Sequence, residues 1–298
     1  MENEAHPTRT IHPVVLGVVA IVGLTLLHLT GSFFFILDAQ DPANRTLARG
    51  MVGLTQLMLM LVPTVILARF AVGPVQQSLR FRPAPPFSYL AMGIAIVAVW
   101  PVLQTLLIVQ ELYLLPSDWL ASFKATQQST EATYRLLLGS ATAADLLLSL
   151  TIGALIPAAS EEILYRGLGQ GLFRQAMRPA GAILVSGLLF ALFHFQPLTF
   201  LPLLGLGCFL GFATHATGSI IPAISGHAMF NAVTIMGLSA VADMPQLQPE
   251  PPTINTELLL QSLPAAGVAF VVLALVILWF RKLKPDASEL TPQDDTFH

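Results

Sequence analysis

Five long apolar segments place the strongest constraint on how this chain can fold. Each has about 20 or more residues, which as a helix is enough to cross roughly 30 Å of hydrocarbon. They are Pro13–Leu37, Leu47–Phe70, Tyr89–Val109, Ser219–Val241 and Leu258–Phe280. Three further apolar segments are shorter or less uniform: Ala143–Ala159, Ala180–Phe195 and Leu198–Ala216. We therefore predict an all-α polytopic transmembrane helix bundle with about eight spans.

Composition excludes the main alternatives to a membrane protein. Charged residues are 10% of the 298, against roughly 25% in an average soluble chain. A soluble protein of this size has too much surface to cover with so few charges. The single cysteine, Cys208, rules out an intrachain disulfide. A net charge of −3 without a basic stripe argues against a nucleic-acid partner.

The distribution of Lys and Arg predicts the orientation, because cytoplasmic loops carry an excess of both. With the N-terminus inside, the inner segments hold Arg9, Arg69, Arg80, Arg82, Arg166, Arg174, Arg178, Arg281, Lys282 and Lys284. The outer segments hold Arg45, Arg49, Lys124 and Arg135. We therefore expect both termini to be cytoplasmic. Short loops and the lack of a retention motif favour a bacterial plasma membrane.

The linker 110–142 is too polar to span the membrane but carries Trp119, Phe123 and Tyr134. Ser117 followed by Asp118 is a plausible helix start. We expect an amphipathic helix on the outer interface here, and a plain irregular loop is the alternative.

Charged and polar side chains inside apolar helices are costly, so their positions indicate function. Glu162 and Arg166 are four residues apart, share a helix face and can pair. Glu161 then points elsewhere, where its carboxylate suits a general base. The structural alternative is an interfacial ion pair beside a second, solvated Glu. Ser160 is interpreted as the N-cap of the helix that carries Glu161.

The second half of the chain adds two polar elements. His227 and Asn231 also share one helix face. His194 is a lone imidazole in an apolar helix, and the turn Phe195-Gln196-Pro197 indicates that this span is broken. His28, in the first span, and His215, assigned to a loop, are interpreted as structural residues.

Glu-Glu-x-x-x-Arg at Glu161–Arg166, Phe-x-x-x-His at Phe190–His194 and His-x-x-x-Asn at His227–Asn231 together resemble the CPBP family. This family comprises CAAX prenyl endopeptidases of the Rce1 type and bacterial Abi and bacteriocin-processing relatives. The resemblance covers Ala159 to Ala232. It implies an intramembrane bundle whose conical, water-filled cavity opens to the cytoplasm and the bilayer.

The same resemblance implies peptide-bond hydrolysis and a role for each motif residue. Glu161 would activate water, His194 would orient it, and His227 and Asn231 would stabilise the oxyanion. Glu162 and Arg166 would be supporting. The expected organisation is a cytoplasmic tail (1–12), one transmembrane domain (13–281, with a catalytic core at about 143–241) and a cytoplasmic tail (282–298).

Two questions stay open at this point. Zinc needs three protein ligands plus water, and Glu161, His194 and His227 could supply them, but a metal-free mechanism is equally compatible. The expected partners are the lipid bilayer and a membrane-associated or lipidated peptide or protein. A non-catalytic membrane protein, either a peptide-binding immunity protein or a proton-coupled transporter, is the alternative function. The polar cluster in only one half of the chain, without an inverted repeat, favours the enzyme.

Overall fold

The computed structural model describes residues 11–38, 43–140, 142–242 and 254–283. Within these ranges the chain is helical and has no strand. Seven segments are long and apolar enough to cross a membrane: Pro13–Ile36, Arg45–Ala71, Pro86–Leu114, Ala143–Phe173, Pro197–Thr217, Ile221–Ser239 and Thr256–Phe280. An eighth apolar helix, Pro179–Leu192, is shorter. The chain is thus an all-α, multi-pass integral membrane protein, as predicted.

Several spans consist of consecutive helical pieces, some of them π-helical (η1 to η4). The elements are α1 (Pro13–Asp38), α2 (Arg45–Thr55), η1 (Gln56–Leu61), α3 (Val62–Ala71), α4 (Val75–Ser78), α5 (Pro86–Val109), η2 (Gln110–Leu114), α6 (Ser117–Leu138), α7 (Ala143–Leu150), η3 (Thr151–Leu155), α8 (Ile156–Glu162), η4 (Ile163–Gly169), α9 (Gln170–Phe173), α10 (Pro179–Leu192), η5 (Pro197–Thr199), α11 (Phe200–Thr217), α12 (Ile221–Ala242) and α13 (Thr256–Phe280).

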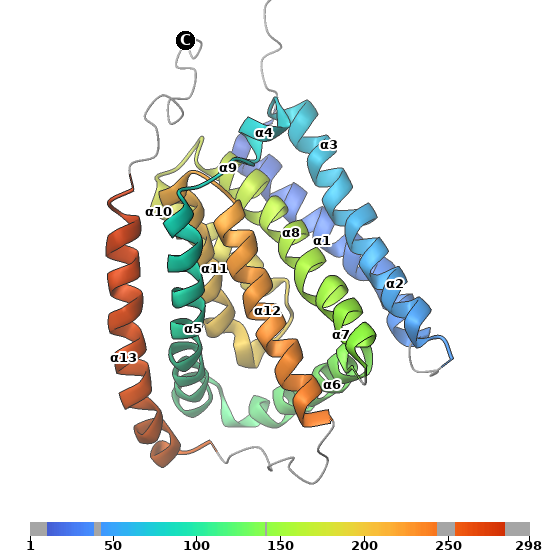
Figure 1. Cartoon of the computed structure of the whole chain (residues 1–298), viewed down its shortest axis with the longest axis vertical. Helices are drawn as coiled ribbons and strands as arrows, with labels where there is room; N and C mark the ends of the chain where they lie inside the picture. The colour runs from blue at the N-terminus through green and yellow to red at the C-terminus, as the bar shows by residue number, and fades with distance from the viewer. Residues whose placement is uncertain (1–10, 39–42, 141, 243–253, 284–298) are drawn as a thin grey trace, which may run out of the picture.

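The bundle has two distinct ends. Figure 1 shows that α1 begins and α13 ends at the same end, at the top of the view, whereas α6 crosses the opposite end. The linker thus contains the predicted helix, starting at Ser117, rather than an irregular loop. The orientation predicted from Lys and Arg would make the α6 end the outer one.

The fourth span is longer than the predicted Ala143–Ala159, because helix continues through α7, η3, α8, η4 and α9 to Phe173. The polar residues in this extension have partners inside the protein. Arg166 pairs with Glu162, and the Gln170 amide donates to the Gly211 carbonyl at 3.0 Å. Ser160 lies inside α8, so its interpretation as an N-cap is wrong.

The α10–α11 hairpin turns around inside the bundle. A helix of 14 residues is about 21 Å long, shorter than the hydrocarbon core. α10 ends at Leu192, and Phe195 follows with a left-handed φ of 51°. Close contact between Gly187 and Gly207 lets the two helices approach tightly. The predicted break is confirmed, and it leaves His194 within the bundle rather than at the outer end of a full span.

A buried glutamine fixes this turn from outside the hairpin. Gln110, at the end of α5, donates to the Pro197 carbonyl at 2.5 Å and accepts from the Leu201 amide at 2.9 Å. Its side chain therefore hydrogen-bonds to two backbone groups of this turn. This clamp holds the segment that begins with His194.

We expect a reporter fused after Lys284 to lie in the cytoplasm and one inserted within 244–253 to lie outside. Both positions are outside the described residues. The reason is the excess of Lys and Arg at the end that carries the start of α1 and the end of α13. Paired alkaline phosphatase and fluorescent-protein fusions measure the two locations. A C-terminal reporter outside the cytoplasm would reverse the orientation of the whole bundle.

Candidate active site

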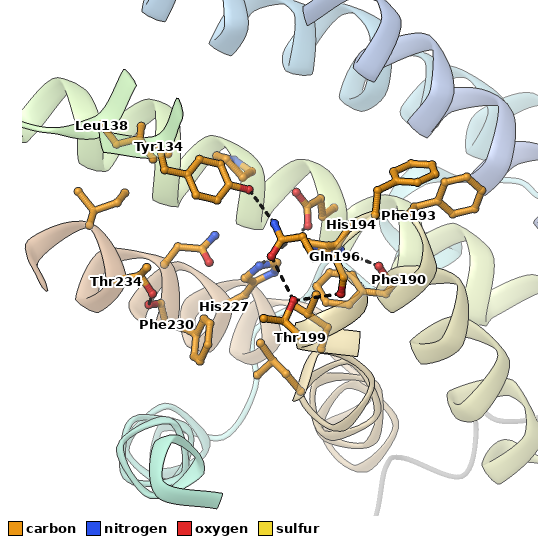
Figure 2. Close-up of a pocket in the computed structure, with 18 of the residues that line it drawn as sticks. Tyr134, Leu138, Phe190, Phe193, His194, Gln196, Thr199, His227, Phe230 and Thr234 are labelled. Atoms are coloured by element: carbon orange, nitrogen blue, oxygen red, sulfur yellow. Dashed lines mark hydrogen bonds and ion pairs between the residues drawn. The ribbon is translucent and has the colours of Figure 1, made fainter. Parts of the chain in front are cut away.

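A cavity of about 550 Å³ lies within the bundle. The four predicted catalytic residues, Glu161, His194, His227 and Asn231, all line it. They come from α8, the turn after α10, and α12. Figure 2 shows His194 and His227 on either side of Phe190, with Tyr134 and Gln196 close by. The structure therefore brings together side chains that are up to 70 residues apart in the chain.

The cavity occupies the half of the bundle nearest α6. On α1 its lining runs from Thr25 to Ile36, and on α12 from His227 to Leu238, which in both helices means from the middle toward the α6 end. Tyr134 and Leu137 of α6 line it as well. With the predicted cytoplasmic termini, the cavity would lie in the outer half of the bundle, whereas the family resemblance implies a cavity that opens to the cytoplasm.

The Glu162 carboxylate is the centre of a buried polar network. Its Oε1 accepts from Arg166 Nη1 at 2.9 Å and from His227 Nδ1 at 2.9 Å. Arg166 Nη2 donates to the Gly207 carbonyl at 3.1 Å. Glu162 and Arg166 have no exposed side-chain surface. The predicted Glu162–Arg166 pair is present, and through it three helices, α8–η4, α11 and α12, are joined.

This network determines which nitrogen of His227 can act in the cavity. Because Nδ1 donates to a carboxylate, Nε2 of the neutral ring carries only a lone pair. Nε2 lies 4.0 Å from Glu161 Oε2, too far for a direct hydrogen bond but within reach of one bridging water. Donation from Nε2 to an oxyanion, the predicted role, requires a ring protonated at both nitrogens. The neutral ring is instead an acceptor.

His194 is held in the same state by a backbone group. Its Nδ1 lies 2.6 Å from the Phe190 carbonyl, which can only accept, so Nδ1 carries the proton and Nε2 is bare. Phe190 packs against both imidazoles, with ring centroids 4.5 Å from His194 and 5.6 Å from His227. Arg166 Cζ lies 4.5 Å from the centre of the same ring. Phe190 thus spaces the two histidines.

Glu161 is set apart from the network, as predicted. Its Oε1 accepts from Gln56 Nε2 at 3.4 Å, and its Oε2 has no hydrogen-bond partner among the described residues. Its side chain lines the cavity and is 17% exposed, although Oε2 itself has almost no exposed surface, whereas Glu162 is fully buried. Asn231 lines the cavity one helical turn from His227, and no described residue hydrogen-bonds to its side chain.

Gln56 and His28 are among the polar cavity residues that the sequence analysis did not assign to the site. Gln56 was passed over, and His28 was interpreted as a packing residue although it lines the cavity and contacts Ser32 Oγ at 3.2 Å. Both are polar side chains in apolar spans, the signal that singled out the other site residues. His215 was assigned to a loop but lies in the last turn of α11.

Glu161, His194 and His227, the three residues considered as zinc ligands, do not form a metal site among the described residues. In these ranges no group of three or more His, Cys, Asp or Glu side chains is close enough to hold an ion. Both imidazoles present Nε2 while Nδ1 is hydrogen-bonded, as in metal-binding histidines, and Glu161 Oε2 lies 4.0 Å from His227 Nε2, but the three side chains do not together form a group that could hold an ion. We therefore derive no step through a metal.

A comparison with known protein families finds a match to one segment of this bundle. Residues 143–233 match the family model described as type II CAAX prenyl endopeptidase Rce1-like. This segment is therefore similar to Rce1-like endopeptidases. It starts with α7 and ends within α12, so it contains the three motifs that carried the resemblance. No curated protein and no solved structure matches the chain significantly. The Rce1-like family supports a protease role.

We expect Glu162→Gln and Arg166→Ala to destabilise the protein by about 3–5 kcal/mol, because each leaves the other buried charge without its partner. The melting temperature in detergent measures the effect. Glu257→Gln, the same change at an exposed position of α13, is the matched control. Equal melting temperatures for Glu162→Gln and Glu257→Gln would contradict a stabilising role for the pair.

Proposed function

We propose that the chain is an intramembrane endopeptidase that hydrolyses a peptide bond of a membrane-associated or lipidated substrate. The observation that carries this proposal is the facing pair of Glu161 Oε2 and His227 Nε2, 4.0 Å apart at the wall of one cavity. A carboxylate and a bare imidazole nitrogen at this separation can both accept hydrogen bonds from one water molecule. Amide hydrolysis needs a water held in that way.

The proposed reaction uses Glu161 as the general base. Water held by Glu161 and the bare Nε2 of His227 attacks the substrate carbonyl carbon, and Glu161 takes the proton. The carbonyl becomes a tetrahedral oxyanion, to which the Asn231 amide donates. When the intermediate collapses, the C–N bond breaks and Glu161 returns the proton to the leaving amine nitrogen. His194, with its own bare Nε2, helps to orient the water.

The fixed tautomers support these roles. Rotation of either imidazole would break a hydrogen bond at Nδ1, so both rings present Nε2 without reorganisation. Glu162 and Arg166 act on the reaction only through His227. Preorganised groups of this kind lower the barrier because they need not reorient as charge develops.

The residues that line the cavity support a mostly apolar substrate segment. Most of its lining is apolar, and Trp100 and Phe230 stack at 4.9 Å along one wall. Its polar lining includes Glu161, His194, His227 and Asn231. This arrangement is typical of ligand sites, in which a few polar groups orient a mostly apolar ligand.

The decisive experiment is cleavage of a tagged panel of membrane-associated and lipidated peptides by the detergent-purified protein. Glu161→Gln keeps the shape of the side chain but cannot accept a proton from water. We expect at least a 10²-fold loss of kcat with an unchanged melting temperature, because Glu161 has only one weak hydrogen bond to lose. Full activity of Glu161→Gln would reject the mechanism. The lack of any cleavage by the wild type would favour the peptide-binding or transporter alternative.

Asn231→Ala tests the oxyanion donor separately from the base. We expect about a 10²–10³-fold lower kcat with nearly unchanged KM, because the donor acts on charge that forms in the transition state. An interhelical hydrogen bond would instead contribute about 0.6 kcal/mol to stability and nothing to catalysis. Thr234→Ala, at another cavity-lining position of α12, is the control. An Asn231→Ala variant that melts early but cleaves at the wild-type rate would make Asn231 a packing residue.

A further inference from the structure

A second group of polar side chains lies outside the cavity, at the end of the bundle opposite α6. It consists of Arg80 and Arg82 between α4 and α5, Arg174 after α9, and His215 in the last turn of α11. We call these four residues the basic cluster. Arg174 and Arg82 are close enough to Arg80 to repel it electrostatically, and His215 is similarly near Arg80 and Arg174.

The basic cluster contains buried polar nitrogens that lack hydrogen-bond partners among the described residues. Arg80 Nη1 and His215 Nδ1 have almost no exposed surface, and neither has a hydrogen-bond partner within the described ranges. Burial, reinforced by Arg174 and Arg82, lowers the pKa of Arg80 to about 9. Buried polar groups without partners are rare in native proteins, and each requires an explanation.

No described carboxylate is among the charges that act on Arg80 or His215. The acidic side chains whose positions are described lie on η2, α6, α7, α8 and the first turn of α13: Glu111, Asp118, Glu131, Asp145, Glu161, Glu162 and Glu257. None of them is among the charges that act on Arg80. The buried guanidinium of Arg80, whose charge none of these carboxylates offsets, is unfavourable unless an anion binds to it.

The backbone holds Arg80 in place at some cost. Its φ is 53°, a left-handed conformation that is strained for a residue with a side chain. The Arg80 amide donates to the Gln77 carbonyl at 3.2 Å, and the Ile220 amide donates to the Arg80 carbonyl at 3.2 Å. Beside the guanidinium lies Gly171, where a Cβ would come within 3.7 Å of Nη2. Strain of this kind is found mainly where a side chain has a function.

Arg82 is fixed by the turn between α11 and α12. Its Nε donates to the Gly218 carbonyl at 2.8 Å, and its own carbonyl accepts from Ser219 Oγ. The loop that carries both arginines is thereby attached to the same turn as Ile220. The cluster is therefore a built site, positioned by three elements, and not a set of free surface arginines.

We propose that the basic cluster binds a phosphate-bearing anion, with Arg80 as its central donor. A guanidinium presents planar pairs of N–H groups that match two phosphate oxygens, and the unpartnered Nη1 of Arg80 and Nδ1 of His215 are available to donate. Two sources share this chemistry, the headgroup of an anionic phospholipid and free phosphate. The proposal does not depend on the proteolytic function, because none of the four residues lines the cavity.

The test measures binding to the full-length, detergent-purified protein from thermal shifts. One arm adds phosphatidylglycerol in mixed micelles, with phosphatidylcholine as the zwitterionic comparison, and the other adds inorganic phosphate against chloride at equal ionic strength. A ligand that binds only the folded state raises the melting temperature with its concentration. Stabilisation by phosphatidylglycerol alone identifies a lipid site, and stabilisation by phosphate identifies an anion site open to water.

Arg80→Gln should weaken the apparent affinity about tenfold or more, because it removes a charge-assisted hydrogen bond. Arg178→Gln, at an exposed position near the same end, should bind as the wild type does. Without ligand, Arg80→Gln should melt no earlier than the wild type, because it removes an unpartnered buried charge. If Arg80 had a purely structural role, the variant would melt at a lower temperature than the wild type.

Two results would overturn the proposal: no stabilisation of the wild type by either anion, or equal stabilisation of the wild type and Arg80→Gln. If Arg80→Gln does not fold, Arg174→Gln takes its place in the same comparison. Unchanged affinity in that variant then rejects the cluster as the binding site.

Discussion

The buried carboxylate of Glu162 is the interaction on which the rest of this structure depends. One of its oxygens receives both a guanidinium N–H, from η4, and an imidazole N–H, from α12. A carboxylate with no exposed surface is tolerated only because both partners are present. Their bonds also fix the rotation of α12 relative to α8, since His227 reaches Glu162 from one face of its helix only. Stability and the geometry of the cavity wall therefore have the same origin.

Phe190 supports the same network through contacts of its ring and through its backbone carbonyl. Its ring packs against Arg166, His194 and His227, and its carbonyl binds His194. One residue thus sets the spacing of two imidazoles and supplies the acceptor that selects a tautomer. The Gln110 clamp completes the arrangement by holding the backbone that follows His194. The candidate site is consequently supported by buried groups, while Glu161, Asn231 and the two imidazoles line the cavity.

Much of this organisation could be predicted from the sequence, and the errors have physical reasons. Apolar length located the spans, and the expense of polar groups in hydrocarbon located Glu161, His194, His227 and Asn231. The extent of the fourth span was underestimated because hydropathy treats Arg166 and Gln170 as exposed. In the structure both side chains donate hydrogen bonds to backbone carbonyls of α11. The His227–Glu162 bond joins residues 65 positions apart, and helix spacing cannot reveal such a contact. The role of each ring nitrogen depends on that bond and on the Phe190 carbonyl, so it required the structure.

The i,i+4 spacing of Glu162 and Arg166 also bears on how the chain enters the membrane. Helices are delivered to the bilayer in chain order, so η4 arrives before α11 and α12 exist to receive its polar groups. Each isolated charge at the middle of a nascent helix opposes insertion by about 2.5–3.5 kcal/mol. Because the two charges lie on one turn of the same helix, they can neutralise each other before any tertiary partner is made. Glu162 and Arg166 can therefore neutralise each other during membrane insertion. His227 then binds to a pair that is already formed.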